Sequence, residues 1–96
     1  MTNEVQISGV LVGEPTLHLQ ADGVEVLQWR MRVARDEGGS DSIPCCSTSP
    51  KVKRFIEKIP DDKTFVAVGE IRSRFWRSGG GTQSRIEVDV TTAARE

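Results

Sequence analysis

Apolar and polar residues alternate along most of this chain with the two-residue period of β-strands. In the first run, from Glu4 to Val12, the apolar residues of one parity are Val5, Ile7 and Leu11. Val10 and Val12 add apolar residues on the other parity, so we expect both faces of this strand's end to be buried or covered by a partner. Gly13-Glu14-Pro15 is expected to end the strand, because proline cannot donate a hydrogen bond to a central ladder.

A second strand is predicted from Val24 to Val33. Its apolar parity shifts between Val26 and Trp29, which predicts a bulge or bend near residues 27–28. From Trp29 onward the alternation is regular: Trp29, Met31 and Val33 point one way, and Arg30 and Arg32 point the other. We interpret Trp29 as a core residue. The glycine-containing segment 37–41 predicts a loop, and residues 43–46 form a short strand candidate.

A helix is the clearest element of the middle of the chain. Ser49 can cap it, and Pro50 occupies the first helical position, where a missing N–H has no cost. Apolar residues recur at helical spacing at Val52, Phe55, Ile56 and Ile59. Pro60 ends the helix. Its basic face is expected to be solvated.

Two further strands are predicted, over residues 65–76 and 83–91. In the second, Ile86, Val88 and Val90 alternate with Arg85, Glu87 and Asp89. The segment 78–82 between them predicts a mobile hairpin tip longer than a two-residue turn. The order strand, strand, strand, helix, strand, strand is that of an all-β OB fold, a five-stranded Greek-key barrel with one helix between strands 3 and 4. We expect residues 1–96 to form this single domain.

The composition, 36% hydrophobic and 28% charged residues in a 96-residue chain, is typical of one globular domain. The sequence has no apolar run long enough to cross a membrane, and the residues after Met1 lack the pattern of a signal peptide. We therefore expect a cytoplasmic protein without membrane partners. The net charge is -1, so any nucleic-acid binding depends on where the charges lie.

Arrangements typical of enzymes and metal sites are missing from the sequence. His18 is the only histidine and is far in sequence from Cys45 and Cys46, so no nucleophile has a nearby base. The two adjacent cysteines are too few for a zinc site and are better explained as buried side chains. The glycines at 79–81 lack the Lys-Ser/Thr that follows a phosphate-binding loop. We expect a non-enzymatic protein without cofactor or metal.

Two strand faces carry the functional signal. Arg30 and Arg32 share one face, and Arg72, Arg74 and Trp76 share another. Single-stranded nucleic acid is held by a positive groove along the phosphates and by rings that stack on bases. The alternative is that these arginines are solvated and face carboxylates across the sheet. Trp76 favours binding, because a large ring beside arginines is costly to leave exposed without a partner.

The sequence also resembles a known family, the bacterial single-stranded DNA-binding proteins. The most specific part of this resemblance is the stretch Val66-Ala67-Val68-Gly69-Glu70-Ile71-Arg72-Ser73-Arg74-Phe75-Trp76, which is similar to the family's V-x-G-x-L-R-x-R-x-W strand. The resemblance implies an OB fold that binds single-stranded DNA with little sequence preference, in replication, repair or recombination, usually as a homotetramer. It places Trp76 on the family's stacking tryptophan, and Arg72 and Arg74 on its basic positions.

Two departures from the family keep other hypotheses open. The other stacking positions hold Glu37, Ser42 and Thr48, none of which stacks, and the sequence ends at residues 94–96 without the family's acidic tail, which is either truncated or naturally absent. A second hypothesis is therefore a tail-less OB-fold accessory protein, similar to primosomal replication protein N, that acts mainly through replication proteins. A third is a structural role within an assembly. In each case we expect a homo-oligomer, a dimer or a tetramer.

Overall fold

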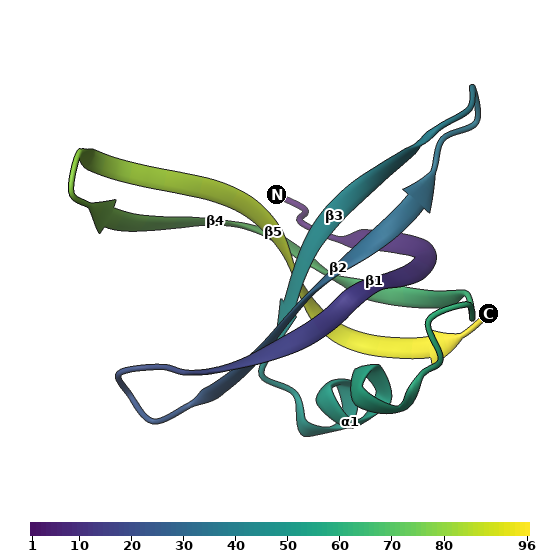
Figure 1. Cartoon of the computed structure of the whole chain (residues 1–96), viewed down its shortest axis with the longest axis horizontal. Helices are drawn as coiled ribbons and strands as arrows, with labels where there is room; N and C mark the ends of the chain where they lie inside the picture. The colour runs from purple at the N-terminus through teal and green to yellow at the C-terminus, as the bar shows by residue number, and fades with distance from the viewer.

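The structure of the protein is a computed structural model that describes residues 1–96, apart from the side chain of Ser78. The elements in chain order are β1 (Val5–Leu19), β2 (Glu25–Ala34), β3 (Ser40–Ser47), α1 (Pro50–Lys58), β4 (Phe65–Ser78) and β5 (Gly81–Arg95). The strands form one closed barrel in the order β1-β2-β3-β5-β4 (Figure 1). The predicted five-stranded OB barrel, with one helix between strands 3 and 4, is confirmed.

Two contacts close the barrel. The start of β1, Val5 to Gly9, pairs antiparallel with β4, and the rest of the strand pairs with β2, so β1 belongs to both sides of the barrel. On the other side, β3 meets β5 in a short parallel contact that joins Cys45 to Val88 and Cys46 to Asp89. This parallel contact matters for function, because it brings β3 beside the base of the β4–β5 hairpin.

The first strand does not end where the sequence analysis expected. β1 continues through Gly13-Glu14-Pro15 to Leu19, and its pairing with β2 is irregular between Val12 and Thr16. Val12 pairs with Arg30 and Thr16 pairs with Gln28, so three residues of β1 face one residue of β2. A bulge of this kind leaves residues out of the ladder, which is why Pro15 is tolerated there.

The bulge expected in β2 lies instead in β1, the strand that pairs with it. β2 itself pairs with β3 in continuous register from Leu27 to Ala34. The parity shift near residues 27–28 arises because Val26, Leu27 and Trp29 are all buried. Burial on both faces of a strand end thus gives the same sequence pattern as a bulge.

The end of the chain also differs from expectation. The hairpin between β4 and β5 turns in two residues, Gly79 and Gly80, because Ser78 already pairs with Gly81. In β5, the alternating residues Val88 and Val90 are buried, but Ile86 on the same parity is exposed and Glu87 on the other parity is buried. Ile86 is exposed because the β4–β5 hairpin extends beyond the barrel (Figure 1), so the apolar side near its tip has no core to cover.

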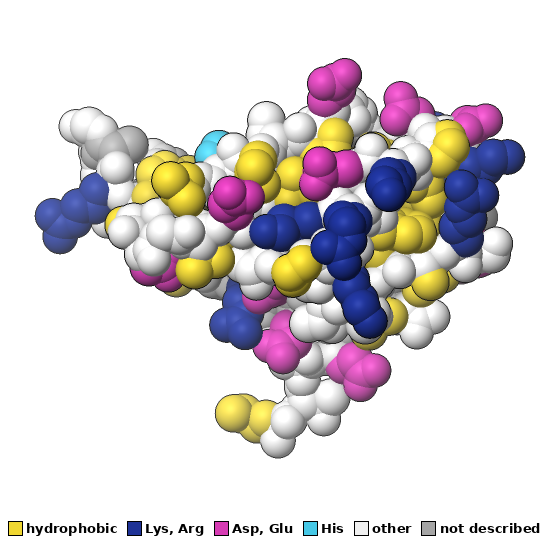
Figure 2. Space-filling model, turned by 90° about the horizontal axis from the view of Figure 1, so that it is seen from below, with side chains coloured by type: hydrophobic (Ala, Val, Ile, Leu, Met, Phe, Trp, Pro, Cys, Tyr) yellow, Lys and Arg dark blue, Asp and Glu magenta, His cyan; other side chains and the backbone are white. Residues whose placement is uncertain are grey.

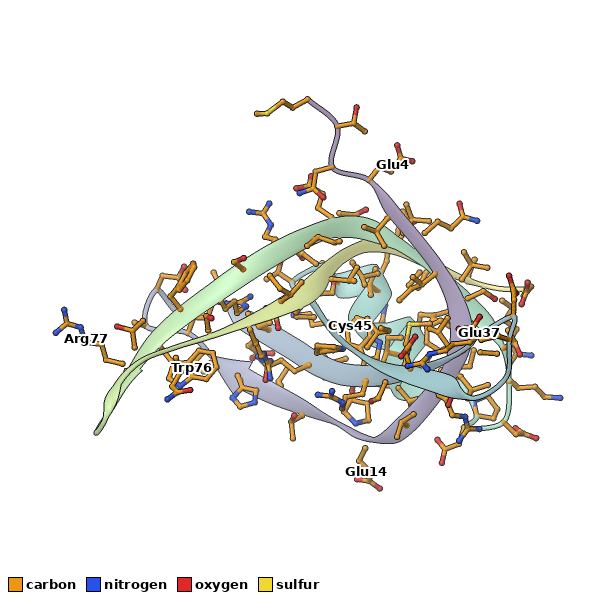
Figure 3. All side chains as sticks on the ribbon, turned by 90° about the horizontal axis from the view of Figure 1, so that it is seen from above. Glu4, Glu14, Glu37, Cys45, Trp76 and Arg77 are labelled. Carbon is orange, nitrogen blue, oxygen red and sulfur yellow. The ribbon has the colours of Figure 1, made fainter. Side chains whose placement is uncertain are left out.

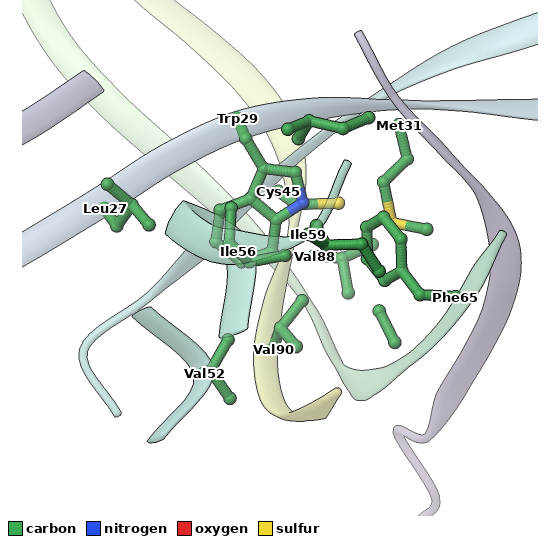
Figure 4. Packing of buried hydrophobic residues seen from close by; sticks show 12 residues of the cluster. Leu27, Trp29, Met31, Cys45, Val52, Ile56, Ile59, Phe65, Val88 and Val90 are labelled. Atoms are coloured by element: carbon green, nitrogen blue, oxygen red, sulfur yellow. The ribbon is translucent and has the colours of Figure 1, made fainter. Parts of the chain in front are cut away.

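The core lies inside the barrel and under α1. Trp29, Met31 and Cys45 from the sheet pack with Ile56 of α1 and with Phe65 of β4 (Figure 4). The helix begins and ends as predicted: Ser49 Oγ accepts a hydrogen bond from the Val52 amide, and Pro50 is the first helical residue. Trp29 is confirmed as a core residue. Within the described part of the chain, no helix is long and apolar enough to cross a membrane.

Candidate nucleic-acid interface

The predicted arginine and tryptophan side chains of β4 lie on one face of the β4–β5 hairpin. Arg72, Arg74 and Trp76 are at alternate positions of β4, and the residues opposite them on β5 are Glu87, Arg85 and Gln83. The Trp76 side chain is 46% exposed. In Figure 3, Trp76 and Arg77 lie on opposite sides of the hairpin, as alternation requires. We call this side, with Arg72, Arg74, Trp76 and Arg85, the arginine face.

A buried carboxylate organises the arginine face. Arg74 and Arg85 are directly opposite each other in the ladder, where two like charges would repel. Glu87, whose side chain is fully shielded from solvent, accepts a hydrogen bond from Arg74 Nε through Oε1 and one from Arg85 Nη2 through Oε2 at 3.0 Å. The three side chains together carry one net positive charge, and each arginine side chain is 38% exposed.

Arg72 is paired in a different way. Its Nε lies 3.2 Å from Asp89 Oδ2, and its Nη2 lies 3.3 Å from Glu70 Oε2. The Arg72 side chain is 57% exposed, so these are surface ion pairs worth about 0–1 kcal/mol each. A phosphate can replace such partners at little cost. The carboxylates expected in the alternative to binding are thus present beside Arg72: Asp89 across the sheet and Glu70 on the same strand.

Cys46, on the outer side of β3, contacts the arginine face. Cys46 Sγ is 3.4 Å from Glu87 Oε1 and 3.7 Å from Arg74 Nη2. Both cysteines are free and buried, as expected. Burial raises the pKa of the Cys45 thiol to about 12, and burial also raises the pKa of Cys46. These thiols are therefore structural groups, and Cys46 contributes contacts rather than reactivity.

A hollow of about 260 Å³ lies at the irregular part of β1. Its walls include Val12 and Glu14 of β1, Arg30 of β2, Pro44 of β3 and Arg85 of β5. Arg30 and Arg85 thus share one depression, and Arg85 is linked to Arg74 through Glu87. The structure therefore places one predicted residue of β2 beside the arginine face.

The other predicted positions lie farther away. Arg32 is exposed two residues along β2 and lines a separate hollow with Gly9 and Val10. Glu37 is in the β2–β3 turn, at the opposite end of the molecule from Trp76 (Figure 3). Thr48 is exposed just after β3, and Ser42 hydrogen-bonds to Arg30. The described residues at these three family stacking positions therefore offer no ring.

Two solved structures of similar shape are those of single-stranded DNA-binding proteins. The mitochondrial single-stranded DNA-binding protein Rim1 of S. cerevisiae has a TM-score of 0.78 at 11% identity, over 99% of this chain and 96% of that one. The small single-stranded DNA-binding protein of Streptomyces coelicolor has a TM-score of 0.72 at 12% identity, over 100% and 96% of the two chains. This chain has the OB fold of those proteins. No family model and no curated protein sequence matches it.

In OB folds, ligands are commonly bound by strands 2–3 together with the 1–2 and 4–5 loops. Here that region contains the hollow beside Arg30, the outer side of β3 and the arginine face. Sequence reasoning missed Arg85 and Glu87 as site residues. The available signal was their alternation on β5: pairing β4 with β5 in one hairpin places their side of β5 against Arg72 and Arg74.

The reverse side of the β4–β5 hairpin is apolar and exposed. Ile71 and Phe75 of β4 and Ile86 of β5 lie on this side, and Phe75 is 70% exposed. We call these three residues the apolar stripe. The two faces of the hairpin thus differ in their side chains: the arginine face is charged and partly aromatic, and the opposite face is apolar.

The basic face of α1 lies elsewhere in the OB fold. Lys51, Arg54 and Lys58 are exposed there, and Figure 2 shows Lys and Arg side chains gathered over this part of the surface. Lys53 Nζ donates to the Glu25 carbonyl. Among the described residues, no three His, Cys, Asp or Glu side chains form a group that could hold a metal ion.

Proposed function

We propose that this protein binds single-stranded DNA, largely independently of sequence, and acts in DNA replication, repair or recombination. Trp76 carries the proposal: an indole 46% exposed shares one strand face with Arg72 and Arg74. Such binding needs at least one ring that can stack on a base and, beside it, cations that can bind phosphates. The likeness in fold to two single-stranded DNA-binding proteins supports it.

The energetics predict strongly salt-dependent binding. A stacked base contributes about 1–3 kcal/mol by alanine substitution in such proteins, and here one tryptophan supplies the ring. The remaining affinity comes from arginines that neutralise phosphates and release counterions. Arg72, Arg74, Arg30 and Arg32 are the proposed phosphate contacts, together with Arg85.

The test is fluorescence anisotropy of a labelled oligo-dT at low and moderate salt. The variant is Trp76→Ala, and the matched control is Phe75→Ala, an exposed ring on the adjacent residue but on the other side of the hairpin. We expect Trp76→Ala to weaken binding about fivefold or more, and Phe75→Ala to change it less than twofold.

The outcomes separate the alternatives. Binding that weakens steeply with salt, and with Trp76→Ala alone, supports the proposal. An equal loss with both variants points to a general disturbance of the hairpin. No binding by the native protein, even at low salt, refutes the proposal.

A second candidate function is favoured by the apolar stripe. Ile71, Phe75 and Ile86 expose apolar surface on the reverse side of the hairpin, which fits an accessory protein that works through contacts with replication proteins. Purified replication proteins passed over the immobilised chain would be retained in this case, and Phe75→Ala would abolish retention. Clean elution of all of them counts against it.

We also propose that the protein is a homo-oligomer, a dimer or a tetramer. The apolar residues on both parities of β1 support this, since Val10 is partly exposed and Val12 is exposed outside the barrel. Light scattering at working concentration gives the mass directly, and a monomer would refute the proposal. The cytoplasmic location and the absence of catalysis stay predictions that accompany the DNA-binding role.

A further inference from the structure

The guanidinium of Arg30 is held by one residue of the neighbouring strand. Its Nε donates to Ser42 Oγ at 2.8 Å, and its Nη2 donates to the Ser42 carbonyl at 3.4 Å. These N–H groups lie in the plane of the guanidinium, so the contacts fix one edge of the group and leave its flat faces unused. Arg30 itself is exposed on the outer side of β2.

The partners of Arg30 distinguish it from the three arginines of the arginine face. Arg72, Arg74 and Arg85 each pair with a carboxylate. Among the described side chains, Arg30 bonds only to the neutral Ser42. Its orientation is therefore fixed without neutralisation of its charge, and a cation held in this way can make a cation–π contact with the face of a flat ring.

The surroundings of Arg30 offer both apolar and hydrogen-bonding contacts to a base. Val12, Arg30 and Pro44 form one row across β1, β2 and β3, so Arg30 has an apolar residue on each side of it in the sheet. All three line the hollow of about 260 Å³, which exists because β1 is irregular at this point. Glu14 and Arg85 line the same hollow: the Arg85 guanidinium already hydrogen-bonds to the buried Glu87, and the carboxylate of Glu14 can accept hydrogen bonds from the edge of a base.

We propose that Arg30 is a base-stacking residue, with one nucleobase of the bound strand lying in this hollow against the guanidinium plane. Guanidinium planes stack on unpaired bases as aromatic rings do. Ser42 occupies a position at which the family that this sequence resembles has an aromatic ring. In this proposal, the hydrogen bond from Arg30 to Ser42 holds the arginine in place. The inference rests on the proposed DNA binding and changes the role of Arg30 from a phosphate contact to a base contact.

Arg30→Lys tests the role, because lysine keeps the charge and loses the plane. Binding is measured by anisotropy with two labelled probes of equal length, oligo-dT and an abasic oligonucleotide with the same phosphates. We expect Arg30→Lys to weaken oligo-dT binding about fivefold or more and abasic binding less than twofold. The slope of affinity against salt stays unchanged on both probes, since the number of cations is the same.

Two further variants sharpen the test. Arg32→Lys, the next outward arginine of β2 and outside this hollow, should affect the two probes equally. Ser42→Ala removes the Nε acceptor and should give a smaller loss that is again confined to oligo-dT. Circular dichroism and thermal unfolding verify that each variant is folded.

The results distinguish the two levels of the proposal. If native protein binds both probes and Arg30→Lys binds them like the native protein, or loses affinity equally on both, base stacking by Arg30 is wrong and DNA binding stands. If native protein binds neither probe, both proposals fail. A loss confined to the probe that carries bases establishes the stacking role.

Discussion

Arg74 reaches diagonally across the β4–β5 hairpin to the buried carboxylate of Glu87, while the residue directly opposite Arg74 is Arg85. Glu87 therefore neutralises one of two facing arginines and fixes the positions of both. The arrangement keeps two guanidiniums at the surface of a hairpin that has no core beneath its tip. Their remaining N–H groups stay available for a ligand, since each side chain is 38% exposed.

Glu87→Gln should destabilise the fold by about 1–3 kcal/mol. The glutamine amide brings an N–H₂ group against guanidinium donors, so one arginine loses its acceptor and the pair of facing positive charges is no longer balanced. Urea unfolding at neutral pH measures the change. Glu70→Gln is the control, because Glu70 is 48% exposed and pairs at the surface with Arg72, and it should cost less than about 0.5 kcal/mol. Equal effects of the two variants would contradict the central role of Glu87.

Much of the fold follows from the sequence because its signals are local. The alternation around Trp29 and Met31 identifies a strand with one core face, and Ser49-Pro50 marks a helix start. The same period puts Arg72, Arg74 and Trp76 on one side of β4. Each of these inferences depends only on residues close together in the chain, and the structure agrees with each of them.

The features that sequence reasoning missed depend on contacts between distant segments. Alternation puts Glu87 on the polar side of β5, but only the parallel contact of β5 with β3 buries it beside Cys46. Pro15 signals an interruption without saying whether β1 ends or bulges, and the answer depends on how β2 pairs with it. The hollow beside Arg30 is a product of that bulge, so it could not be foreseen either.

Gly69→Ala should destabilise the protein by about 1–3 kcal/mol. Gly69 is buried where the register of β4 and β5 shifts, and a Cβ there would collide with the backbone carbonyl of Asp89. Because the obstacle is backbone, it cannot move aside as a flexible side chain would. Thermal and urea unfolding report the loss.

Gly79→Ala is the matched control for this substitution in the same hairpin. A Cβ at Gly79 meets no atom within 4 Å, so stability should change by less than about 0.5 kcal/mol. A loss at Gly79 as large as that at Gly69 would mean that the hairpin tolerates no side chain at all, rather than that Gly69 lacks space.

The two cysteines should react with a thiol reagent only when the protein unfolds. Cys45 and Cys46 are both 1% exposed, and burial raises the pKa of the Cys45 thiol to about 12. At pH 8, labelling should therefore be slow in buffer and complete in urea. The urea concentration at which half of the thiols are labelled should coincide with the midpoint of the unfolding curve. Fast labelling of either cysteine in buffer would contradict the packing of β3 against the core.

The same thiols give a pH dependence at the alkaline end. The folded pKa of Cys45 lies above its ordinary value of 9.0, so the folded state holds this proton more tightly. Its contribution to stability is complete below about pH 9 and is lost as pH rises from there toward 12. Cys45→Ala should flatten the decline of unfolding free energy over this range, and an unchanged decline would assign it to other groups.

At the acidic end, Asp41 should contribute stability that disappears on protonation. The Arg35 guanidinium hydrogen-bonds to Asp41, with Nε 3.1 Å from Oδ2, and holds the pKa of that carboxyl below its ordinary value of 3.8. A depressed folded pKa means that the contribution is present above the unfolded pKa and is lost as pH falls through the folded one. Asp41→Asn should therefore be less stable than the native protein at pH 6, with the difference vanishing as the pH falls below about 3.8. A constant gap between Asp41→Asn and the native protein down to pH 2 would refute the pairing with Arg35 as its cause.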